Sequence, residues 1–348
     1  MIKSIAALLL VLLLSPLSFA DVRIGTWNVM RLGSGDSKNY DSLAIVGSHF
    51  DFIALQEVMT EEGLSSLKEA LEKETHEKWN VMASHLVGRG RYKEMYAFIW
   101  RESAVSYVDG AVLYTDTSDD FEREPFSAKF MDKSTGANFA AATIHIYYGK
   151  SESDRTPEIR NLTTYWKWLD EVYSGTPVLL MGDFNMNPDN DSWVSLKEYA
   201  MPLAITGAST LSLKDGLFSN LYDNIWVSKS IGQAYGSATV YEYPKILGVT
   251  NEEARKTVSD HAPLYLMLKN IQSQPLNKVF DTQKVSAKSQ EAGLELIHGN
   301  KNSRIYHLPG CPSYNSMSEG SMIAFKTEFQ AKKEGYRMAK NCRINREN

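Results

Sequence analysis

The chain contains a series of short, unbroken apolar runs, and most of them end at a carboxylate, a carboxamide or an imidazole. The clearest is the run from Val178 to Met181, which leads through Gly182 into Asp183 and Asn185. Unbroken apolar runs of this length are typical of strands that are buried on both faces. The same pattern recurs over residues 22–29, 50–57, 95–100, 138–146, 221–227 and 262–268.

Segments in which apolar residues have helical spacing lie between some of these runs, but not at regular intervals. They are found over residues 41–50, 61–73 and 157–173, with no internal repeat and no strict alternation of strand and helix. This arrangement predicts an α/β or α+β sandwich over residues 21–270, in which helices cover the strands.

The first 20 residues have the organisation of a signal peptide. Lys3 precedes an apolar core from Ile5 to Leu14, and small residues at Ser18 and Ala20 suit a cleavage site. The apolar core is too short to cross a bilayer. We therefore expect a protein that is secreted, either extracellular or periplasmic, after cleavage near Ala20. An uncleaved anchor is the alternative.

A change of charge separates a large domain from a small C-terminal module. Residues 21–270 carry 24 Lys and Arg against 35 Asp and Glu, a net charge of −11, whereas residues 271–348 carry 12 against 7, a net charge of +5. Residues 271–290 are polar and weakly periodic, so we expect a linker there and a separate module at 291–348. The acidic large domain cannot attract a polyanion by net charge alone, so such a substrate would need local cations.

Polar side chains gather at the ends of the predicted strands. They are Asn28, Glu57, His145, Asp183, Asn185, Asp223, Asn224, Asp260 and His261. Any one of them fits a cap or a turn, but polar groups at the ends of several buried strands need partners or a role. Oxygen ligands without cysteine suit a hard cation such as Mg²⁺, and histidines beside carboxylates suit acid–base catalysis. Together they suit the hydrolysis of a phosphate ester.

A set of motifs in the order WNV, LQEV, IHI, GDFN, YDNIW and SDHAPL resembles the endonuclease/exonuclease/phosphatase superfamily. The motifs extend over nearly all of residues 21–268. The resemblance implies a four-layer sandwich, with two packed β-sheets flanked by helices and the active site at one edge. It also implies a phosphoesterase that depends on Mg²⁺, with Mn²⁺ or Ca²⁺ as alternative ions.

The resemblance implies a role for each oxygen ligand. Glu57 is expected to be the principal metal ligand, with Asn28 beside it, and Asp260 is the acidic residue that precedes the catalytic histidine. Asp183 and Asn185 resemble the pair that contacts the scissile phosphate and the attacking water, or a second metal.

The two histidines are expected to share the proton transfers. His261 resembles the general base, oriented by Asp223. His145 resembles the second histidine of the family, which binds phosphate or acts as the general acid. The sequence leaves the number of metal ions open.

Two stretches resemble the nucleases of the deoxyribonuclease I type more closely than the rest of the superfamily. In RYKEMYAF, residues 91–98, Tyr92 matches a tyrosine that lies in the minor groove, and Glu94 is expected to pair with His145. In FEREP, residues 121–125, Arg123 matches a contact to a DNA phosphate. These contacts would favour duplex binding without reading of the bases.

The likeness to these nucleases has departures. Met59 stands where they carry an arginine that joins the minor-groove contact, and Arg31 lies one position beyond the family's arginine, which Met30 replaces. Fewer cationic contacts weaken duplex binding, so the preference between DNA and RNA stays open.

The C-terminal module resembles the metal-binding domain of the Ada DNA-repair protein. The matching positions are His307, Cys311, Ala339 and Cys342, where the Ada module uses four thiolates. Alanine binds no metal, and structural zinc sites almost always have four ligands. We therefore expect a Cys311–Cys342 disulfide in an oxidising compartment, with zinc as the alternative.

These features together predict a secreted, divalent-metal-dependent endonuclease that hydrolyses the phosphodiester bonds of DNA, with RNA left open as a further substrate. We expect a monomer that acts on double-stranded DNA without sequence specificity and has no stable membrane insertion. One alternative is a secreted sphingomyelinase or phosphoinositide phosphatase on the same fold. The other is a surface or interaction protein that keeps the fold without catalysis.

Overall fold

The computed structural model describes residues 21–35, 37–268, 297–308, 311, 314, 321–325, 331–332 and 334–339. The chain divides into two units, Met1–Pro275 and Leu276–Asn348. The predicted signal peptide at 1–20 and the predicted linker at 271–290 lie outside the described residues, so both stay predictions.

The first unit contains two six-stranded mixed sheets. The first has the strand order β11-β12-β1-β2-β4-β3, with β1 at Val22–Leu32, β2 at Phe52–Val58, β3 at Trp79–Ala83, β4 at Met95–Arg101, β11 at Thr239–Val240 and β12 at Leu264–Leu268. The second has the order β5-β6-β7-β8-β10-β9, with β5 at Val105–Leu113, β6 at Phe126–Asp132, β7 at Asn138–His145, β8 at Val178–Asp183, β9 at Ala200–Pro202 and β10 at Asp223–Ser228. The pairs β1–β2 and β7–β8 are parallel.

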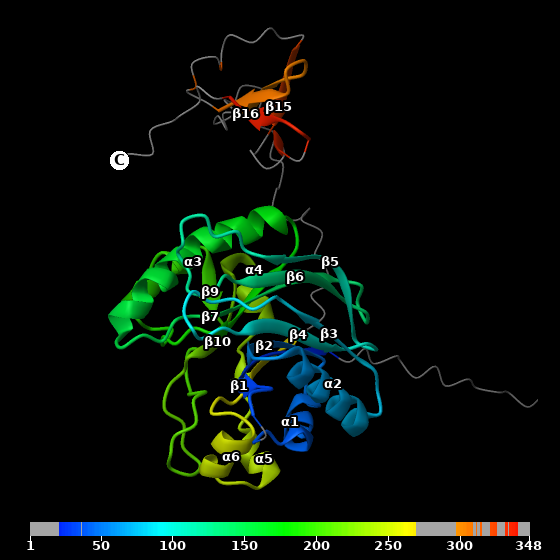
Figure 1. The fold of residues 1–348 in the computed structure, drawn as a ribbon, viewed down its shortest axis with the longest axis vertical. Helices are drawn as coiled ribbons and strands as arrows, with labels where there is room; N and C mark the ends of the chain where they lie inside the picture. The colour runs from blue at the N-terminus through cyan, green and yellow to red at the C-terminus, as the bar shows by residue number, and fades with distance from the viewer. Residues whose placement is uncertain are drawn as a thin grey trace, which may run out of the picture. The chain divides into compact units, whose positions relative to one another are not determined.

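Helices cover the outer faces of the two sheets, apart from the helix at Lys229–Tyr235, which packs against the layer between them. They are α1 at Tyr40–Gly47, α2 at Glu61–Thr75, α3 at Glu152–Val172, α4 at Lys229–Tyr235, α5 at Tyr243–Leu247 and α6 at Asn251–Thr257, with short 3₁₀ turns at Asp191–Trp193 and Leu196–Glu198. Figure 1 shows α3 outside the second sheet, and α1 and α2 outside the first. The predicted fold class, two packed β-sheets flanked by helices, is confirmed.

Strand alternation explains why the apolar runs are unbroken. In β2, Phe52 packs between the sheets, whereas Ile53 packs beneath the helices on the outer face. In β8, Leu179 packs between the sheets and Leu180 packs toward α3. Because successive side chains of a strand point to opposite faces, a strand with a helical layer on one side and a second sheet on the other must be apolar at every position.

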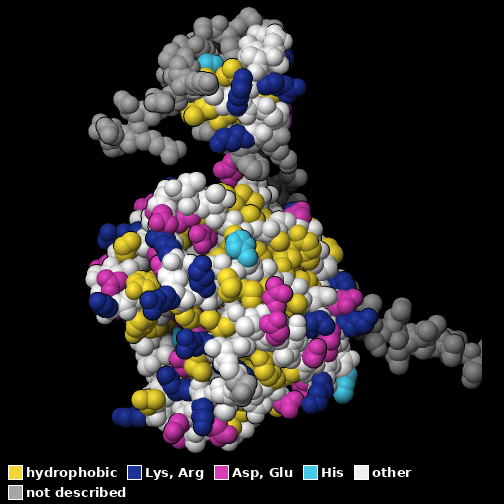
Figure 2. Space-filling model, in the orientation of Figure 1, with side chains coloured by type: hydrophobic (Ala, Val, Ile, Leu, Met, Phe, Trp, Pro, Cys, Tyr) yellow, Lys and Arg dark blue, Asp and Glu magenta, His cyan; other side chains and the backbone are white. Residues whose placement is uncertain are grey.

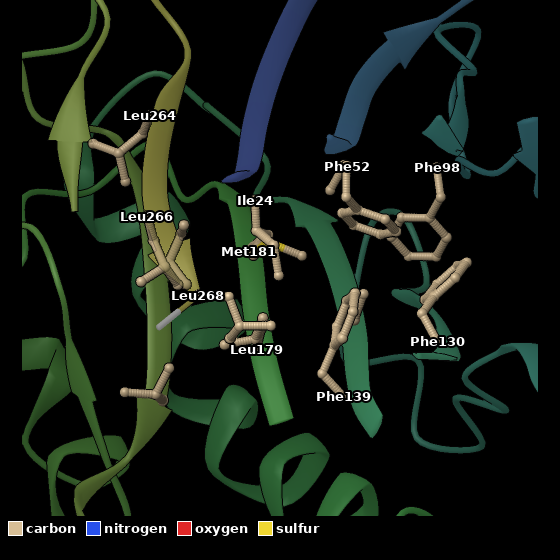
Figure 3. Packing of buried hydrophobic residues seen from close by; sticks show 14 of the residues in the cluster. Ile24, Phe52, Phe98, Phe130, Phe139, Leu179, Met181, Leu264, Leu266 and Leu268 are labelled. Carbon is tan, nitrogen blue, oxygen red and sulfur yellow. The ribbon is translucent and has the colours of Figure 1, made fainter. Parts of the chain in front are cut away.

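The layer between the sheets is rich in phenylalanine. Figure 3 shows the rings of Phe52, Phe98, Phe130 and Phe139 gathered together, from strands of both sheets. The centroids of Phe52 and Phe130 are 4.7 Å apart in a T-shaped contact. Edge-to-face contacts of this kind add to the free energy gained from burial of the apolar surface.

Helix α3 begins earlier than the sequence predicts. The predicted start was Pro157, but the helix begins at Glu152, where the Asp154 carboxylate accepts hydrogen bonds from the backbone N–H groups of Lys150 and Ser151. A proline in the second turn removes only one backbone hydrogen bond, so the helix continues through it. The predicted buried face is confirmed at Ile159, Leu162, Tyr165, Trp166 and Leu169.

The second unit contains a small sheet of order β15-β13-β14-β16, with β13 at Ile297–Asn300, β14 at Ile305–His307, β15 at Met322–Phe325 and β16 at Arg337–Met338. Cys311 is buried and packs with Ala339, so two of the positions that match the Ada module lie together. Cys342 lies outside the described residues, and the Cys311–Cys342 disulfide stays a prediction.

Among the residues that the structure describes, none of the helices has both the length and the apolar character needed to cross a membrane.

Gly182 generates a prediction about stability, because β7 passes very close to it. Its φ is +152°, and a Cβ at this position would lie 1.9 Å from the carbonyl oxygen of Ile144. We expect Gly182→Ala to lower the free energy of unfolding by about 2–6 kcal/mol, since backbone strain and steric overlap each cost about 1–3 kcal/mol. Urea unfolding followed by tryptophan fluorescence measures this change.

The matched control is Gly175→Ala. Gly175 also has a positive φ, +76°, but no heavy atom lies within 4 Å of the added Cβ. In this variant the free energy of unfolding should fall only by the cost of placing a residue with a Cβ at positive φ, about 1–2 kcal/mol. Equal losses in the two variants would show that the approach of Ile144 is unimportant.

Candidate active site

A cavity of about 460 Å³ opens where the ends of strands from both sheets meet. Its lining includes the predicted site residues Asn28, Glu57, Tyr92, Arg123, His145, Asp183, Asn185, Asp260 and His261. Glu94 and Asp223, the two remaining predicted residues of this unit, are fully buried and contact the histidines. The structure therefore brings these residues together, whereas the side chain of Asn224, which the sequence also places at a strand end, bonds to the backbone of Ala204 and does not line the cavity.

Strand register places three of these residues in one row. In the parallel pair β7–β8, His145 is level with Asp183, and in the antiparallel pair β8–β10, Asp223 is level with Asp183. A slip of one residue would turn the side chains of a strand to the other face. The row therefore depends on the same register that buries the apolar residues of these strands.

His261 and Asp223 form a hydrogen-bonded pair. The ring Nδ1 of His261 lies 2.7 Å from Asp223 Oδ2, and its Nε2 lies 3.6 Å from Asp183 Oδ2. Burial lowers the pKa of His261, but the carboxylates of Asp223 and Asp183 outweigh burial and hold the pKa well above its usual value of 6.5. The Asp223 contact also fixes which nitrogen of His261 faces the cavity.

His145 and Glu94 form a second pair on the opposite side of Asp183. The ring Nδ1 of His145 lies 3.0 Å from Glu94 Oε1, and its Nε2 lies 3.6 Å from Asp183 Oδ2. Burial lowers the pKa of His145, but Glu94 reverses this effect and the net pKa is raised above 6.5. Both histidines thus direct Nε2 toward one carboxylate oxygen.

Asp183 is the shared partner of both histidines and of the first sheet. The side-chain amide of Asn28 donates from Nδ2 to Asp183 Oδ2 at 3.1 Å and to Glu57 Oε1 at 3.0 Å. Burial raises the pKa of Asp183, but His261 and His145 outweigh it, so the net pKa is lowered and the carboxylate is ionised. Asn28 therefore joins carboxylates that come from different sheets.

Unusual backbone geometry is concentrated at the cavity. Glu57 and Asn185 have positive φ values of 60° and 50°, as do Met30 and Arg31 after Asn28, at 42° and 58°. The pairing of β1 with β2 shifts register between Asn28 and Leu32. Such bulges re-aim side chains, and strained residues persist only where surrounding contacts hold them.

Several residues that the sequence did not nominate support the loop before His261. Ser259 Oγ donates to the Asn28 carbonyl at 2.6 Å and accepts from the His261 N–H at 3.1 Å. Lys38 Nζ donates to the carbonyls of Val29 at 3.0 Å and Val258 at 2.6 Å. Burial lowers the pKa of Lys38 to about 8, and nearby acidic groups only partly offset this effect. These contacts fix the histidine loop to the end of β1.

Two buried charged residues of α3 support the other wall of the cavity. Arg155 donates to the Asn185 carbonyl at 2.5 Å, and Glu158 accepts from the backbone N–H of Tyr147 at 3.2 Å. Both residues fall on the apolar face of α3, at the helical spacing of its core residues. Charged residues at core positions are rarely fully buried unless paired, so this spacing was a signal in the sequence.

The predicted substrate contacts occupy more buried positions than expected. Arg123 is 5% exposed and donates from Nε and Nη2 to the His145 carbonyl. The Tyr92 hydroxyl donates to Glu94 Oε2 at 3.0 Å. The guanidinium groups of Arg31 and Arg123 lie 5.9 and 5.8 Å from the Tyr92 ring centroid. Arg31 thus brings a cation to this tyrosine despite its shifted position in the sequence.

The oxygen ligands of the cavity fit a hard divalent cation. Among the described residues, Asp183, Asp223 and His261 form a group that could hold a metal, with ligand atoms within 4.8 Å of one another. The 2.7 Å contact between His261 and Asp223 already engages two of these atoms, and Asp183 accepts hydrogen bonds from Asn28 and from the backbone N–H of Asn185, so a cation at this group would share these oxygens with their present donors. Glu57, Asp260 and Asn28 line the same cavity, and carboxylate and carbonyl oxygens are the ligands that Mg²⁺ and Ca²⁺ take.

A comparison with family models gives one match that covers most of the large domain. The model of the Endonuclease/Exonuclease/phosphatase family matches residues 25–261. The chain belongs to this family. The match runs from β1 to His261 and so includes both histidine–carboxylate pairs.

Within the endonuclease/exonuclease/phosphatase family, several similar curated proteins are deoxyribonucleases by name. A Deoxyribonuclease of Thioalkalivibrio sp. (strain K90mix) is 42% identical over 312 residues, which cover 87% of this chain and 84% of that protein. Deoxyribonuclease-1-like 2 of Homo sapiens is 36% identical, and the match covers 72% of this chain and 93% of that protein. Deoxyribonuclease-1 of Bos taurus is 27% identical, covering 72% and 92%. These matches support membership of the deoxyribonuclease-like nucleases.

Solved structures of the family share the fold at low identity. A family protein of Bacteroides thetaiotaomicron aligns with a TM-score of 0.52 and 19% identity, covering 71% of this chain and 96% of that one. The human Nocturnin catalytic domain aligns with a TM-score of 0.50 and 15% identity, and the alignment covers 72% of this chain and 93% of that one. The likeness of the second unit to the Ada module stays a prediction.

The histidine pairs generate a prediction about pKa values. Replacing Asp223 by Asn keeps the shape but removes the charge that most raises the pKa of His261, so this pKa should fall while that of His145 changes less. Ring signals followed by NMR over a pH titration give both values in one sample. Glu94→Gln is the reciprocal control and should lower the pKa of His145. An unchanged His261 pKa in Asp223→Asn would contradict the electrostatic account.

Proposed function

We propose that this protein is a secreted, divalent-metal-dependent endonuclease that hydrolyses the phosphodiester bonds of DNA. The single observation that carries the proposal is the pair of histidines on either side of Asp183, each with Nε2 3.6 Å from the same oxygen and each backed by a buried carboxylate. The names of the relatives support DNA as the substrate.

The proposed mechanism is in-line attack of water on phosphorus. His261, held by Asp223, accepts the proton of the attacking water through Nε2. Because this mechanism needs a neutral His261 and a protonated His145, the rate should rise with pH as His261 deprotonates and fall again as His145 loses its proton. Asp183 and Asn185 orient the water and the phosphate. His145, kept protonated by Glu94, donates to the phosphate or to the leaving oxygen.

A divalent cation would be held by Glu57, with Asp183, Asp260 and Asn28 as further oxygen ligands. Mg²⁺ is the proposed ion, with Mn²⁺ or Ca²⁺ as alternatives, and its chemistry would be to neutralise the charge that develops on phosphate oxygens. Without a cation, these carboxylates would repel a phosphodiester.

Substrate binding is proposed to rest on local rather than overall charge. Figure 2 shows Lys and Arg mixed with Asp and Glu over the face of the large unit that it presents. Arg31 and Arg123 flank Tyr92 at the cavity and would contact phosphates on either side of the tyrosine. Such contacts favour double-stranded DNA without sequence specificity. We further propose that the protein acts as a monomer, after removal of residues 1–20.

The histidines provide the first test of this function. In nicking of supercoiled plasmid with Mg²⁺, His145→Ala and His261→Ala should each lower the rate by about 10²–10⁴-fold, the usual contribution of one general acid or base. EDTA should abolish nicking by the unsubstituted protein.

The matched control is His85→Ala, because His85 is exposed and does not line the cavity. This variant should keep the full rate. A loss of less than tenfold in both cavity variants would overturn the proposal. Absence of nicking by the folded protein would move the search to other phosphoesters, beginning with sphingomyelin liposomes.

Metal binding provides a separate test. Glu57→Gln removes the charge of the principal ligand and should weaken Mg²⁺ binding by at least about tenfold, since even outer partners of a metal site contribute about 10–100-fold. Isothermal titration calorimetry on the EDTA-treated protein measures this directly. Glu69→Gln, on the exposed side of α2, is the control. Equal affinities in the two variants would remove Glu57 from the metal site.

A further inference from the structure

The cavity has an aromatic wall that the proposed mechanism does not use. Tyr147 and Tyr148 lie two and three residues after His145, the last residue of β7, and both line the cavity. They are 44% and 55% exposed, which is unusual for neighbouring aromatic residues beside a polar site. Exposed aromatic side chains at a functional cleft point to a ligand with an apolar face.

A buried arginine holds the ring of Tyr148 from behind. The guanidinium of Arg155 lies 4.1 Å from the Tyr148 ring centroid. Arg155 itself is 4% exposed. One face of the ring is therefore covered, while the side chain remains more than half exposed overall.

The same arginine is fixed by hydrogen bonds, so the ring rests on a rigid support. Arg155 donates from Nε to the Tyr148 carbonyl at 2.7 Å and from Nη1 to the Asn185 carbonyl at 2.5 Å. Tyr148 is thus tied to Asn185 through one side chain. A ring that is already held in place loses little entropy when a flat ligand stacks on it.

The ring lies in the same cavity as the catalytic histidines. Three residues of chain span at most about 11 Å, so Tyr148 is close enough to contact a nucleotide a few positions or fewer from a phosphate held at His145. Every nucleobase has a flat face, and stacking on an aromatic ring is the common mode of single-strand recognition. In a duplex both faces of an interior base are already stacked.

We propose that Tyr148, supported by Arg155, is a stacking platform for an unpaired nucleobase near the scissile phosphate, so that double-stranded DNA opens locally at this position, whereas a single strand binds there without that cost. This inference rests on the proposed nuclease function and refines its substrate. Tyr147 contributes a second exposed ring to the same wall.

The first experiment measures binding, independently of cleavage. The probe is a single-stranded oligonucleotide that carries 2-aminopurine, added to the His261→Ala protein with Mg²⁺, and compared with the same strand in a duplex. Stacking should quench the fluorescence of the single strand. Tyr148→Ala should raise the dissociation constant of the single strand by about 5- to 100-fold, the range expected for one base on an aromatic ring. The ratio of duplex to single-strand dissociation constants should fall by a similar factor.

Matched variants distinguish stacking of Tyr148 on a base from a purely structural role in which Tyr148 only packs against Arg155. Tyr148→Phe keeps the ring and should keep both the quenching and the ratio. Tyr148→Leu keeps apolar contact with Arg155 but removes the flat ring, and should behave as Tyr148→Ala does. Tyr107→Ala removes a tyrosine of similar exposure, 43%, on β5 outside the cavity and should change nothing.

The outcomes distinguish this inference from the proposed function. The value to compare is the ratio of kcat/KM on single-stranded DNA to kcat/KM on duplex DNA. If the protein cleaves DNA and this ratio is the same with and without Tyr148→Leu, the stacking platform is overturned, but the nuclease function stands. Equal losses on both substrates would overturn the platform as well. Cleavage of neither substrate by the unsubstituted protein would overturn the function and the platform together.

Discussion

The buried carboxylate of Asp183 is the contact on which the rest of the site depends, because side chains from both sheets meet it. Asn28 reaches Asp183 from the first sheet, and His145 reaches it from the neighbouring strand of the second. His261 approaches from the loop before β12. Neither sheet alone could build this arrangement. The packing of the two sheets therefore also assembles the site. The phenylalanine-rich layer between the sheets stabilises the fold and, by holding the sheets together, the site as well.

Much of the fold could be predicted because the buried strands carry unbroken apolar runs up to their polar ends, as in β2, β4 and β8. β5 escaped prediction since most of it is exposed, and a strand of that kind has no apolar pattern to reveal it. The histidine–carboxylate pairs came from the family motifs rather than from periodicity. Lys38 and Ser259 could not be found at all, because they bind backbone carbonyls, and such contacts leave no mark on the residue types of their partners.

The concentration of buried charge explains why so many supporting contacts are needed. Glu94 is fully buried, and it is compensated by His145, by Arg123 at 3.5 Å and by the Tyr92 hydroxyl. Removal of His145 or Arg123 would leave this buried charge less well compensated, which is more costly than loss of an exposed ion pair. A fold that holds charged groups and positive-φ residues in this way gives up stability for geometry, as functional sites generally do.

The same charge balance links the substrate to the cation. Glu57, Asp183 and Asp260 face the cavity with Glu94 and Asp223 close behind, so the carboxylates outweigh the arginines that line it. A phosphodiester entering this cavity alone would meet repulsion, whereas a cation alone would be attracted. Binding of the two should therefore be cooperative, since each reduces the electrostatic cost of the other. The acidic character of the domain, which at first argues against a polyanionic substrate, is in this sense what the proposed metal-dependent cleavage needs.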